Sequence, residues 1–468
     1  MPLWSELLCC LWLLRPACGR LRTFLWMALV LIGLALRPEI AGVTSFVRAL
    51  GLKGSSYRRL LWLFHTPSLD LDRLTGLWVG LVLRLFSPLS VLGRPVLVAD
   101  GLKAPKEGRK MPAVKKLHQE SSNNSKPEFI WGHSFQALGL LVLGPLGQVF
   151  CVPLASRIHE GLVFNNRDRR TLLDKLVALF LEIARHVAGR PLLLADGYYA
   201  SRKVIRPLVE KGYDLVSRLR KNAVAYWPAA PETKVRRGPR RTYGQKVKLW
   251  KLFDDEDLFT RADSPVYGEK GVVLRYRSVD LLWRRAGRLV RMVLVDHPSR
   301  GRLILLSTCL DLDALQVISL YGYRFKIEVG FRQAVHTIGA YAYHFWMKAM
   351  TPRPRRSGNQ FLHKKSDDYR RLVRRKIDAY HRFVQLAAVA QGLQQHLALN
   401  SRRLVWRHFN GWMRTMTPAA PPSEAVVAHA LRNSLPELLA LCPKADPVTH
   451  FLLQHADPAR CPALKLAG

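Results

Sequence analysis

The sequence predicts an α/β protein with helical regions at both ends of the chain, and three observations favour that fold class. Residues 95–101 (PVLVADG) and 191–197 (PLLLADG) are both short apolar runs that end in Asp-Gly, as buried strands of a parallel or mixed sheet often do. Helical patterns precede, separate and follow these runs. The chain has 468 residues, 49% of them hydrophobic, which is enough for two or three domains with a large core.

Residues 1–90 have a mostly helical pattern. Within them, 43–50 and 55–64 are candidate helices joined by the turn Gly-Leu-Lys-Gly. We expect Ser55 to cap the second helix, which carries Arg58 and Arg59 near its start. The pair has helix-turn-helix character and is either a DNA-reading unit or an ordinary helix pair.

The central elements follow in the order strand, hairpin, helix, strand, helix, strand, which is the order of a ribonuclease H-like fold. In that fold the first and fourth strands are parallel neighbours, so Asp100 and Asp196 would meet where open α/β sheets place their active sites. Two close carboxylates repel each other and need a cation between them, although either Asp-Gly alone could simply open a turn. The expected strands are 94–100, 129–143, 148–158, 191–196 and 214–219, and the expected helices are 168–187 and 201–211.

After Arg220 the pattern changes to short apolar runs separated by polar turns, which predicts a β-rich insertion in the core. Its clearest strands are expected at 272–276, 279–283, 289–295 and 303–306, and the helical pattern returns near residue 312. The expected domains are a helical, DNA-binding region at 1–90, the first part of the core at 91–220, the insertion at 221–310, a core helix with a third acid at 311–345, and a basic helical region at 346–468.

The third acid is expected within residues 321–328, which read YGYRFKIE. At about 100° per residue, Tyr321 and Glu328 share one helix face and Arg324 lies close to it. Glu can hold a metal ion, Arg can grip a phosphate with two hydrogen bonds, and Tyr can donate another, although an ordinary amphipathic helix would look similar. Asp296 is a rival, because it too ends an apolar strand, but no Arg or Tyr accompanies it at helical spacing.

Positive charge narrows the choice of partner. Lys and Arg outnumber Asp and Glu by 73 to 34, a formal net charge of +39, and this self-repulsion is best explained by a nucleic-acid partner. Three basic runs point the same way, although each could be only a solvated surface. They hold Lys103, Lys106, Arg109, Lys110, Lys115 and Lys116; then Lys234, Arg236, Arg237, Arg240, Arg241, Lys246 and Lys248; and finally ten Lys or Arg within 353–376.

Two further patterns bear on the cellular compartment. The seven cysteines are scattered, without a Cys-x-x-Cys pair or a spacing typical of zinc sites, as expected of thiols in a reducing cytoplasm. The uncharged run at 23–36 is too short to span a membrane, and the run at 134–156 is broken by Gly-Pro-Leu-Gly. We therefore expect no transmembrane segment and no signal peptide.

Taken together, these features resemble the DDE transposases of bacterial insertion sequences, in the group with a β-strand insertion before the catalytic Glu. The resemblance covers nearly the whole chain and rests on Asp100, Asp196 and the pattern Tyr321-x2-Arg324-x3-Glu328. Further matching segments lie at 100–103, 108–118, 196–199, 217–220 and 238–244.

The resemblance implies that Asp100, Asp196 and Glu328 hold two divalent ions, Mg²⁺ or Mn²⁺, for cleavage and strand transfer of DNA. The implied substrates are terminal inverted repeats and target DNA, bound by a homodimeric synaptic complex in a bacterial cytoplasm, at the nucleoid. The expected DNA contacts are Tyr321, Arg324, Arg332, Lys103, Arg236, Arg237, Arg240, Arg241, Arg58 and Arg59.

The chain departs from the family pattern at one position. The family signature continues with Lys seven residues after the Glu, and Val335 stands there. Arg332, His336 or Lys326 could make that phosphate contact instead. Two other classes therefore stay open: a related nuclease without strand transfer, and a DNA-binding derivative that has lost catalysis.

Overall fold

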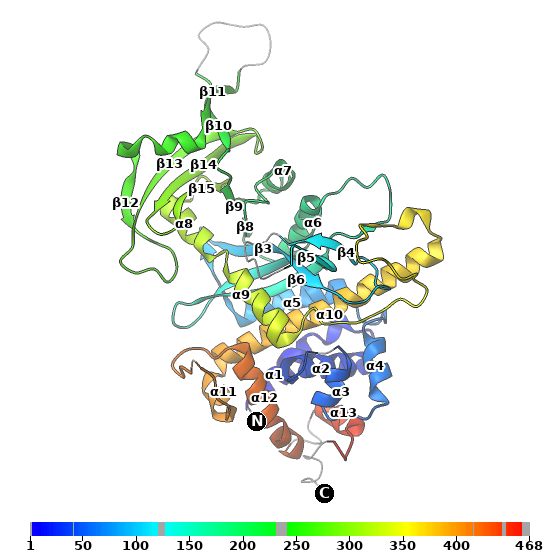
Figure 1. Ribbon diagram of the computed structural model, residues 1–468. Coiled ribbons are helices and arrows are strands. Elements are labelled where there is room, and N and C mark those ends of the chain that lie inside the picture. The colour runs from blue at the N-terminus through cyan, green and yellow to red at the C-terminus, as the bar shows by residue number, and fades with distance from the viewer. Residues whose placement is uncertain are drawn as a thin grey trace. The chain divides into compact units, whose positions relative to one another are not determined.

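The computed structural model describes residues 2–40, 42–119, 127–230, 241–414, 416–441 and 446–460 (Figure 1). The chain forms two compact units, each made of stretches that are far apart in the sequence. Unit 1 comprises Met1–Pro88, Gly101–Arg169 and Val329–Gly468, and unit 2 comprises Leu89–Asp100 and Arg170–Glu328. Strand β3 (Arg94–Pro105) and helix α9 (Lys326–Gln333) each begin in unit 2 and end in unit 1.

Unit 2 is built around three parallel strands. β3 pairs with β8 (Leu192–Ala195), and β8 pairs with β9 (Leu215–Leu219). The paired residues are almost entirely buried Val, Leu and Ala, as expected for parallel strands that are covered on both faces. Helix α6 (Leu172–Ala184) precedes β8, and α7 (Arg202–Glu210) forms the crossover from β8 to β9.

The β-rich segment predicted after Arg220 is present, and it extends the sheet of unit 2. β15 (Gly301–Ser307) pairs antiparallel with β9, and the sheet continues through β14 (Arg288–His297), β13 (Val273–Trp283), β10 (Val224–Pro228) and β11 (Tyr243–Lys248). The two strands expected at 272–276 and 279–283 are one, because Arg277 and Ser278 keep their ladder partners in β14. The remaining elements of this part are β2 (Ser90–Val91), β12 (Thr260–Asp263), the 3₁₀ turns η2 (Leu249–Phe253) and η3 (Glu256–Leu258), and α8 (Ala314–Tyr323).

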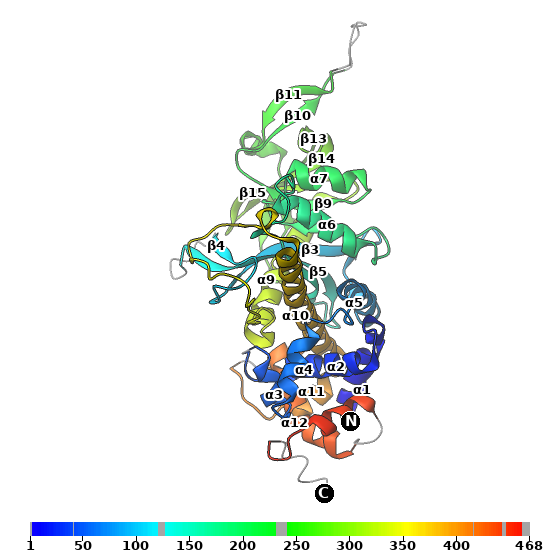
Figure 2. The same ribbon diagram turned by 90° about the vertical axis from the view of Figure 1, so that its right-hand side faces the viewer.

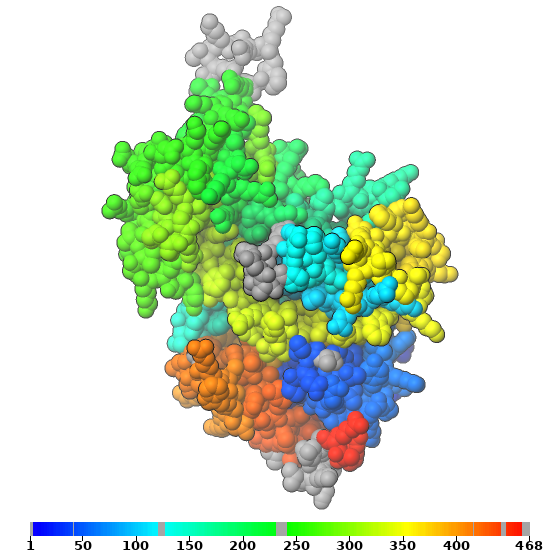
Figure 3. All heavy atoms as spheres, in the orientation of Figure 1, coloured from blue at the N-terminus to red at the C-terminus, as the bar shows by residue number. Residues whose placement is uncertain are grey.

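Unit 1 contains the predicted hairpin, β5 (Phe129–Leu143) and β6 (Val149–Ile158), whose turn uses Gly147 with a φ of 75°. β5 also pairs with β1 (Ser87–Pro88) and β4 (Lys115–His118). A short parallel pair joins β7 (Leu162–Val163) to β16 (Gln360–Phe361). In Figure 3 the yellow atoms of the segment after residue 350 lie beside cyan atoms of unit 1. The backbone N–H of Met347 donates to the carbonyl of Lys110 at 2.9 Å.

Helices from the two ends of the chain form the rest of unit 1. The long helix α10 (Asp367–Asn400) packs against β6 and against N-terminal helices, with α2 beside it in Figure 2. Because α12 and α13 also pack on α2, the first and last parts of the chain share one core. The helical elements are α1 (Pro2–Leu13), η1 (Arg15–Ala17), α2 (Leu21–Leu36), α3 (Thr44–Ala49), α4 (Ser56–Leu63), α5 (Leu71–Leu85), the π-helix η4 (Ala334–Ile338), η5 (Leu362–Lys364), α11 (Arg402–His408), α12 (Glu424–Leu441) and α13 (Pro447–His455).

A buried polar cluster in unit 1 corrects one expectation. Lys106, predicted within a basic run for phosphate contact, is only 7% exposed, and its ammonium donates to the carbonyls of Tyr341 and Tyr343. The Tyr343 hydroxyl lies 2.7 Å from Nδ1 of His133, whose Nε2 donates to the carbonyl of Pro112 at 2.8 Å. Burial lowers the pKa of Lys106 to about 7 and that of His133 to about 3. Lys106 therefore has a structural role within unit 1 and is not available to DNA.

The expectation that the first core strand ends at Asp100 is wrong, because β3 continues through Gly101 to Pro105. The first and fourth core strands are parallel neighbours, and the molecule is a mixed α/β protein with a large mixed sheet and helical flanks. Ser55 does precede α4, but the prediction that it caps the helix is wrong, because its side chain makes no capping hydrogen bond. The domain boundaries expected from the sequence stay predictions.

In the described part of the chain, no helix is both long and apolar enough to cross a membrane. Cys9, Cys10, Cys18, Cys151 and Cys309 are free thiols, and all but Cys9 are buried.

Candidate active site

Two of the predicted acids are neighbours across a pair of parallel strands. Ala99 of β3 lies opposite Ala195 of β8, so Asp100 and Asp196 are the next residues on two parallel neighbours. Neighbouring strands are roughly 4.8 Å apart, and residues in register point to the same face of a sheet. The two carboxylates therefore share one face of unit 2. The backbone N–H of Tyr198 donates to Asp196 Oδ1 at 2.9 Å, which orients that side chain.

Arg324 links the first acid to the third. Its Nη1 lies 3.1 Å from Asp100 Oδ2, and its Nη2 lies 2.5 Å from Glu328 Oε1. The side chains of Arg324 and Asp100 are each 19% exposed, whereas that of Glu328 is 54% exposed. The guanidinium thus neutralises part of the negative charge that the acids bring together.

The segment that carries these residues is not the single regular helix expected from the sequence. Helix α8 ends at Tyr323 and α9 begins at Lys326, and at the junction Glu328 N–H bonds to the carbonyl of Phe325, three residues back. Gly322, the weakest helix former of the segment, lies just before this break. Arg324 keeps helical dihedral angles, so it still reaches Glu328 four residues ahead.

Tyr321 completes the cluster. Burial raises the pKa of its phenol, the nearby charges of Arg324 and Arg218 lower it, and the charge of Asp196 raises it. These interactions bring Tyr321, Arg324 and Asp196 to one place in unit 2. Arg218 was not singled out by the sequence reasoning. The pattern that could have indicated Arg218 is Ser-Arg-Leu-Arg at the end of the third parallel strand.

The donor set suits a hard divalent cation, because all three acids offer carboxylate oxygens. Asp100, Asp196 and Glu328 supply three negative charges, and Arg324 offsets one of them. In the described part of the chain, however, their oxygens do not form a group within 4.8 Å of one another. The residues therefore fit a metal ion, provided that Arg324 releases the acids it now pairs with.

Asp296, the rival third acid, has other partners. It pairs with Arg275 at 2.7 Å and lies 3.9 Å from Arg302, and both residues stand opposite it on the flanking strands β13 and β15. A carboxylate held between two Arg side chains of the same sheet has a structural role.

The other predicted DNA contacts are either exposed, or paired with a ring or a backbone carbonyl, or outside the described residues. Arg332 in α9 and His336 in η4 are exposed, whereas Lys326 lies 3.7 Å above the ring of Tyr267. Lys103 donates to the carbonyl of His118 at 2.7 Å, and the exposed Arg241 donates to the carbonyl of Tyr243 at 3.0 Å. Arg236, Arg237 and Arg240 lie outside the described residues.

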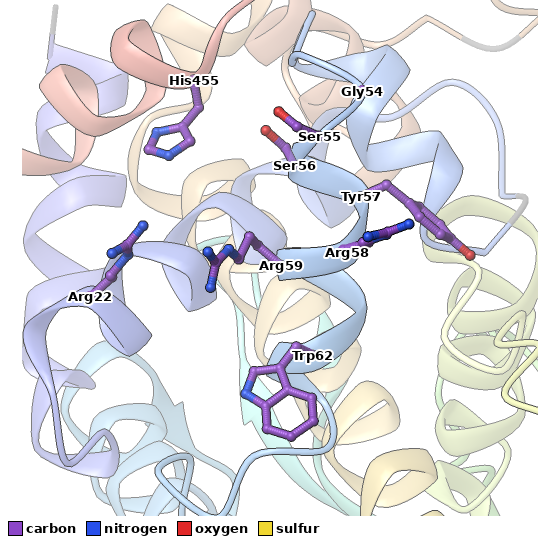
Figure 4. A pocket seen from close by; sticks show the side chains of 9 residues that line it. All are labelled: Arg22, Gly54, Ser55, Ser56, Tyr57, Arg58, Arg59, Trp62 and His455. Carbon is purple, nitrogen blue, oxygen red and sulfur yellow. The ribbon is translucent and has the colours of Figure 1, made fainter.

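A basic pocket surrounds the start of α4 in unit 1. Figure 4 shows Arg59 and Arg22 pointing toward each other across the pocket, whereas Arg58 points away, toward Tyr57. The hydroxyl of Ser56 is buried and has no hydrogen-bond partner among the described residues. The pocket has a volume of about 850 Å³ and is lined by Arg22, Gly54, Ser55, Ser56, Tyr57, Arg58, Arg59, Trp62 and His455.

An exposed aromatic side chain forms one edge of this pocket. Trp62 is 55% exposed, and the guanidinium of Arg375 lies 5.0 Å from its ring centroid. Arg375 belongs to the basic start of α10, so positive charge from three helices, α2, α4 and α10, gathers in this part of unit 1.

Comparison with known proteins gives one match. The model of the DDE superfamily endonucleases matches residues 14–264, more than half of the chain, and this range includes Asp100 and Asp196 but ends before Glu328. No curated protein matches the sequence. The family implies a ribonuclease H-like core, phosphoryl-transfer chemistry on DNA and the use of divalent metal ions. The chain therefore belongs to the DDE superfamily endonucleases.

Proposed function

We propose that the protein is a DNA transposase that cuts DNA at the ends of an insertion sequence and joins the freed ends to target DNA. The observation that supports this most is the meeting of Asp100 and Asp196 on adjacent parallel strands, with Glu328 tied to Asp100 through Arg324. An arginine beside the acids suits a phosphodiester-cutting site, because a planar guanidinium can bind either a carboxylate or a phosphate with two hydrogen bonds.

In this proposal, Asp100, Asp196 and Glu328 hold two divalent ions, Mg²⁺ or Mn²⁺. Such ions, when bound, activate the attacking oxygen and stabilise the leaving oxygen of a phosphodiester. Arg324 exchanges its carboxylate partners for the scissile phosphate and holds it with two hydrogen bonds. Tyr321 stays protonated, because burial raises the pKa of its phenol, and donates a hydrogen bond to a phosphate oxygen. Arg218 adds positive charge at the same place.

A related nuclease that cuts without strand transfer is the second candidate, and Val335 is the observation that favours it. The lysine of the family signature is missing, and the exposed Arg332 and His336 are the cationic or titratable neighbours on either side of that position. A pre-cut oligonucleotide with a free 3′-hydroxyl separates the two: a transposase joins it to target DNA, and a nuclease does not.

Substitution of the three acids tests the catalytic assignment. Asp100→Ala, Asp196→Ala and Glu328→Gln should each abolish Mg²⁺-dependent cleavage and leave DNA binding intact, because they hold metal and do not contact bases. Asp296→Asn is the matched control and should cut at the normal rate, because its partners lie within the β-rich part of unit 2. Near-normal cleavage by any of the three variants would remove that residue from the site.

The basic pocket at α4 is proposed to bind DNA, as part of a homodimer that works on inverted repeats in the bacterial cytoplasm. Arg22 and Arg59 face one another across the pocket and suit a phosphate, whereas Arg58 points elsewhere and is the better candidate for reading a base edge.

Salt dependence distinguishes these two roles. Arg22→Gln with Arg59→Gln should make the plot of log affinity against log salt shallower by roughly 2, at about 0.9 for each phosphate that is no longer neutralised. Arg58→Gln should instead reduce the preference for end DNA over random DNA at an unchanged slope. If neither measurement changes in either variant, α4 has only a structural role, and specific recognition lies elsewhere.

A further inference from the structure

A second cluster of metal-ligating side chains lies in unit 1, and it includes none of the acids of unit 2. Helix α1 carries Glu6 and Cys10 four residues apart, so both lie on one face of the helix, and α10 brings His396 to that face. One ligand atom from each of the three lies within 4.8 Å of the other two, and it is the one such group among the described residues. We infer that Glu6, Cys10 and His396 form a binding site for Zn²⁺ or another thiophilic divalent ion.

The ligand set differs from that of the active site. A thiolate sulfur, an imidazole nitrogen and a carboxylate oxygen are typical zinc ligands, and three of them leave a fourth position for water. Cys10 is 3% exposed and His396 is 4% exposed. A divalent ion with one thiolate and one carboxylate is a neutral unit, which burial penalises much less than a charged one.

The separations are short enough for side-chain movement alone to close the site. Bond lengths of roughly 2.3 Å to sulfur and 2.0 Å to nitrogen or oxygen place tetrahedral ligand atoms about 3.3–3.5 Å apart. His396 Nε2 lies 2.7 Å from Glu6 Oε1, so an ion between them needs only a small separation of these two groups. The half-exposed carboxylate of Glu6 gives an ion access from solvent.

The surroundings of His396 allow the required change of tautomer. In the metal-free state Nε2 donates to Glu6, and the Nδ2 amide of Asn400 lies 2.8 Å from Nδ1. Binding needs the Nε2 lone pair, so the ring proton moves to Nδ1, where the Asn400 oxygen accepts it once the amide turns over. The edge of Phe86 packs on the imidazole with a centroid separation of 5.9 Å and limits its rotation.

The proton balance is then defined. Binding needs the Cys10 thiolate, so the thiol proton leaves when the ion binds, and burial raises the pKa of this thiol to about 12. One proton is therefore released for each ion bound. An ion at this site would tie α1 to α10, near the opposite ends of the chain, and would stabilise unit 1 by mass action. The site shares no residue with the proposed active site.

Cobalt substitution tests the inference on the full-length protein. After removal of metals with a chelator, one equivalent of Co²⁺ should produce tetrahedral d–d bands and a sulfur-to-cobalt charge-transfer band, and Zn²⁺ should displace it while excess Mg²⁺ does not. Cys10→Ser should lose the charge-transfer band, and Cys9→Ser is the matched control because Cys9 is the exposed neighbour in the same helix. Asp100→Ala should keep the full spectrum.

A second variant keeps the test decisive if Cys10→Ser does not fold. Glu6→Gln retains a hydrogen-bonding group beside His396 and changes a half-exposed side chain, so it should fold and bind Co²⁺ at least tenfold more weakly. The inference is overturned if the wild-type protein binds no Co²⁺, if Cys10→Ser keeps the charge-transfer band, or if Glu6→Gln binds with wild-type affinity.

Discussion

Replacing Arg324 with Gln should make the acids bind metal more tightly while making the enzyme cut more slowly. In the structure Arg324 pairs with Asp100 and Glu328, so an arriving cation must compete with the guanidinium. The variant removes this competitor and leaves all three carboxylates in place. It also removes the side chain that we propose grips the scissile phosphate.

The expected gain in affinity can be worked from the exposure of the two pairs. The Asp100 pair joins two side chains that are each 19% exposed, so we take about 1.5 kcal/mol, the lower end for a charge-assisted hydrogen bond. The Glu328 carboxylate is 54% exposed, so solvent screening reduces its pair to about 0.5 kcal/mol. Together they give at most about 2 kcal/mol, or roughly a 30-fold lower Kd for the cation.

Titration of the metal-free protein with Mn²⁺ in the absence of DNA, followed by calorimetry, measures this Kd directly. Arg332→Gln is the matched control, because it removes an exposed arginine from α9 and should leave the Kd unchanged. DNA cleavage by Arg324→Gln should fall by about 10²-fold, as for other lost transition-state donors. An unchanged or higher Kd in Arg324→Gln would refute the competition.

Two further predictions concern stability. Burial lowers the pKa of Lys106 to about 7, below its value in the unfolded chain, so between about pH 7 and 10 the unfolded chain binds one more proton than the folded protein. The free energy of unfolding should therefore rise with pH in this range, by at most about 1.4 kcal/mol per pH unit. Urea unfolding of Lys106→Met should lack this rise, and the same pH dependence in the variant and the wild type would contradict the prediction. Gly161→Ala should lower the free energy of unfolding by about 2–4 kcal/mol, since its φ is +96° and a Cβ would lie 2.1 Å from the carbonyl of Ala113. Gly147→Ala, with a φ of +75° and nothing within 4 Å, should cost only about 1 kcal/mol and isolates the steric part.

Burial patterns explain why much of the fold could be predicted from the sequence. The hairpin expected at 129–143 and 148–158 is β5 and β6 almost to the residue, because most of its apolar residues are buried between the exposed ends of β5. The second Asp-Gly strand, β8, also lies within its expected range, whereas the first, β3, continues past Asp100 to Pro105. Their parallel pairing followed from the order of elements, which leaves few ways to build a sheet.

Interactions between distant parts of the chain explain what could not be predicted. The sequence pattern predicted that Lys106 is one more surface charge. Its buried ammonium instead donates to two backbone carbonyls, and no sequence pattern indicates such a contact. The meeting of Cys10 with His396 joins α1 to α10, and no local spacing marks it. The pairing of Arg324 with Asp100 likewise depends on how α8 and β3 meet within unit 2.

The two candidates for the third acid, Asp296 and Glu328, have similar sequence patterns but different ion-pair partners in the structure. Asp296 and Glu328 both carry an arginine partner, but Asp296 is fixed between strands whose registers place Arg275 and Arg302 opposite it. The strand registers keep both arginines beside the Asp296 carboxylate. Glu328 is more than half exposed on a helix, and Arg324 can exchange it for a phosphate at little cost. A site that must hold a cation and then a polyanion needs this second kind of carboxylate, and so we expect Asp296→Asn to cut DNA where Glu328→Gln does not.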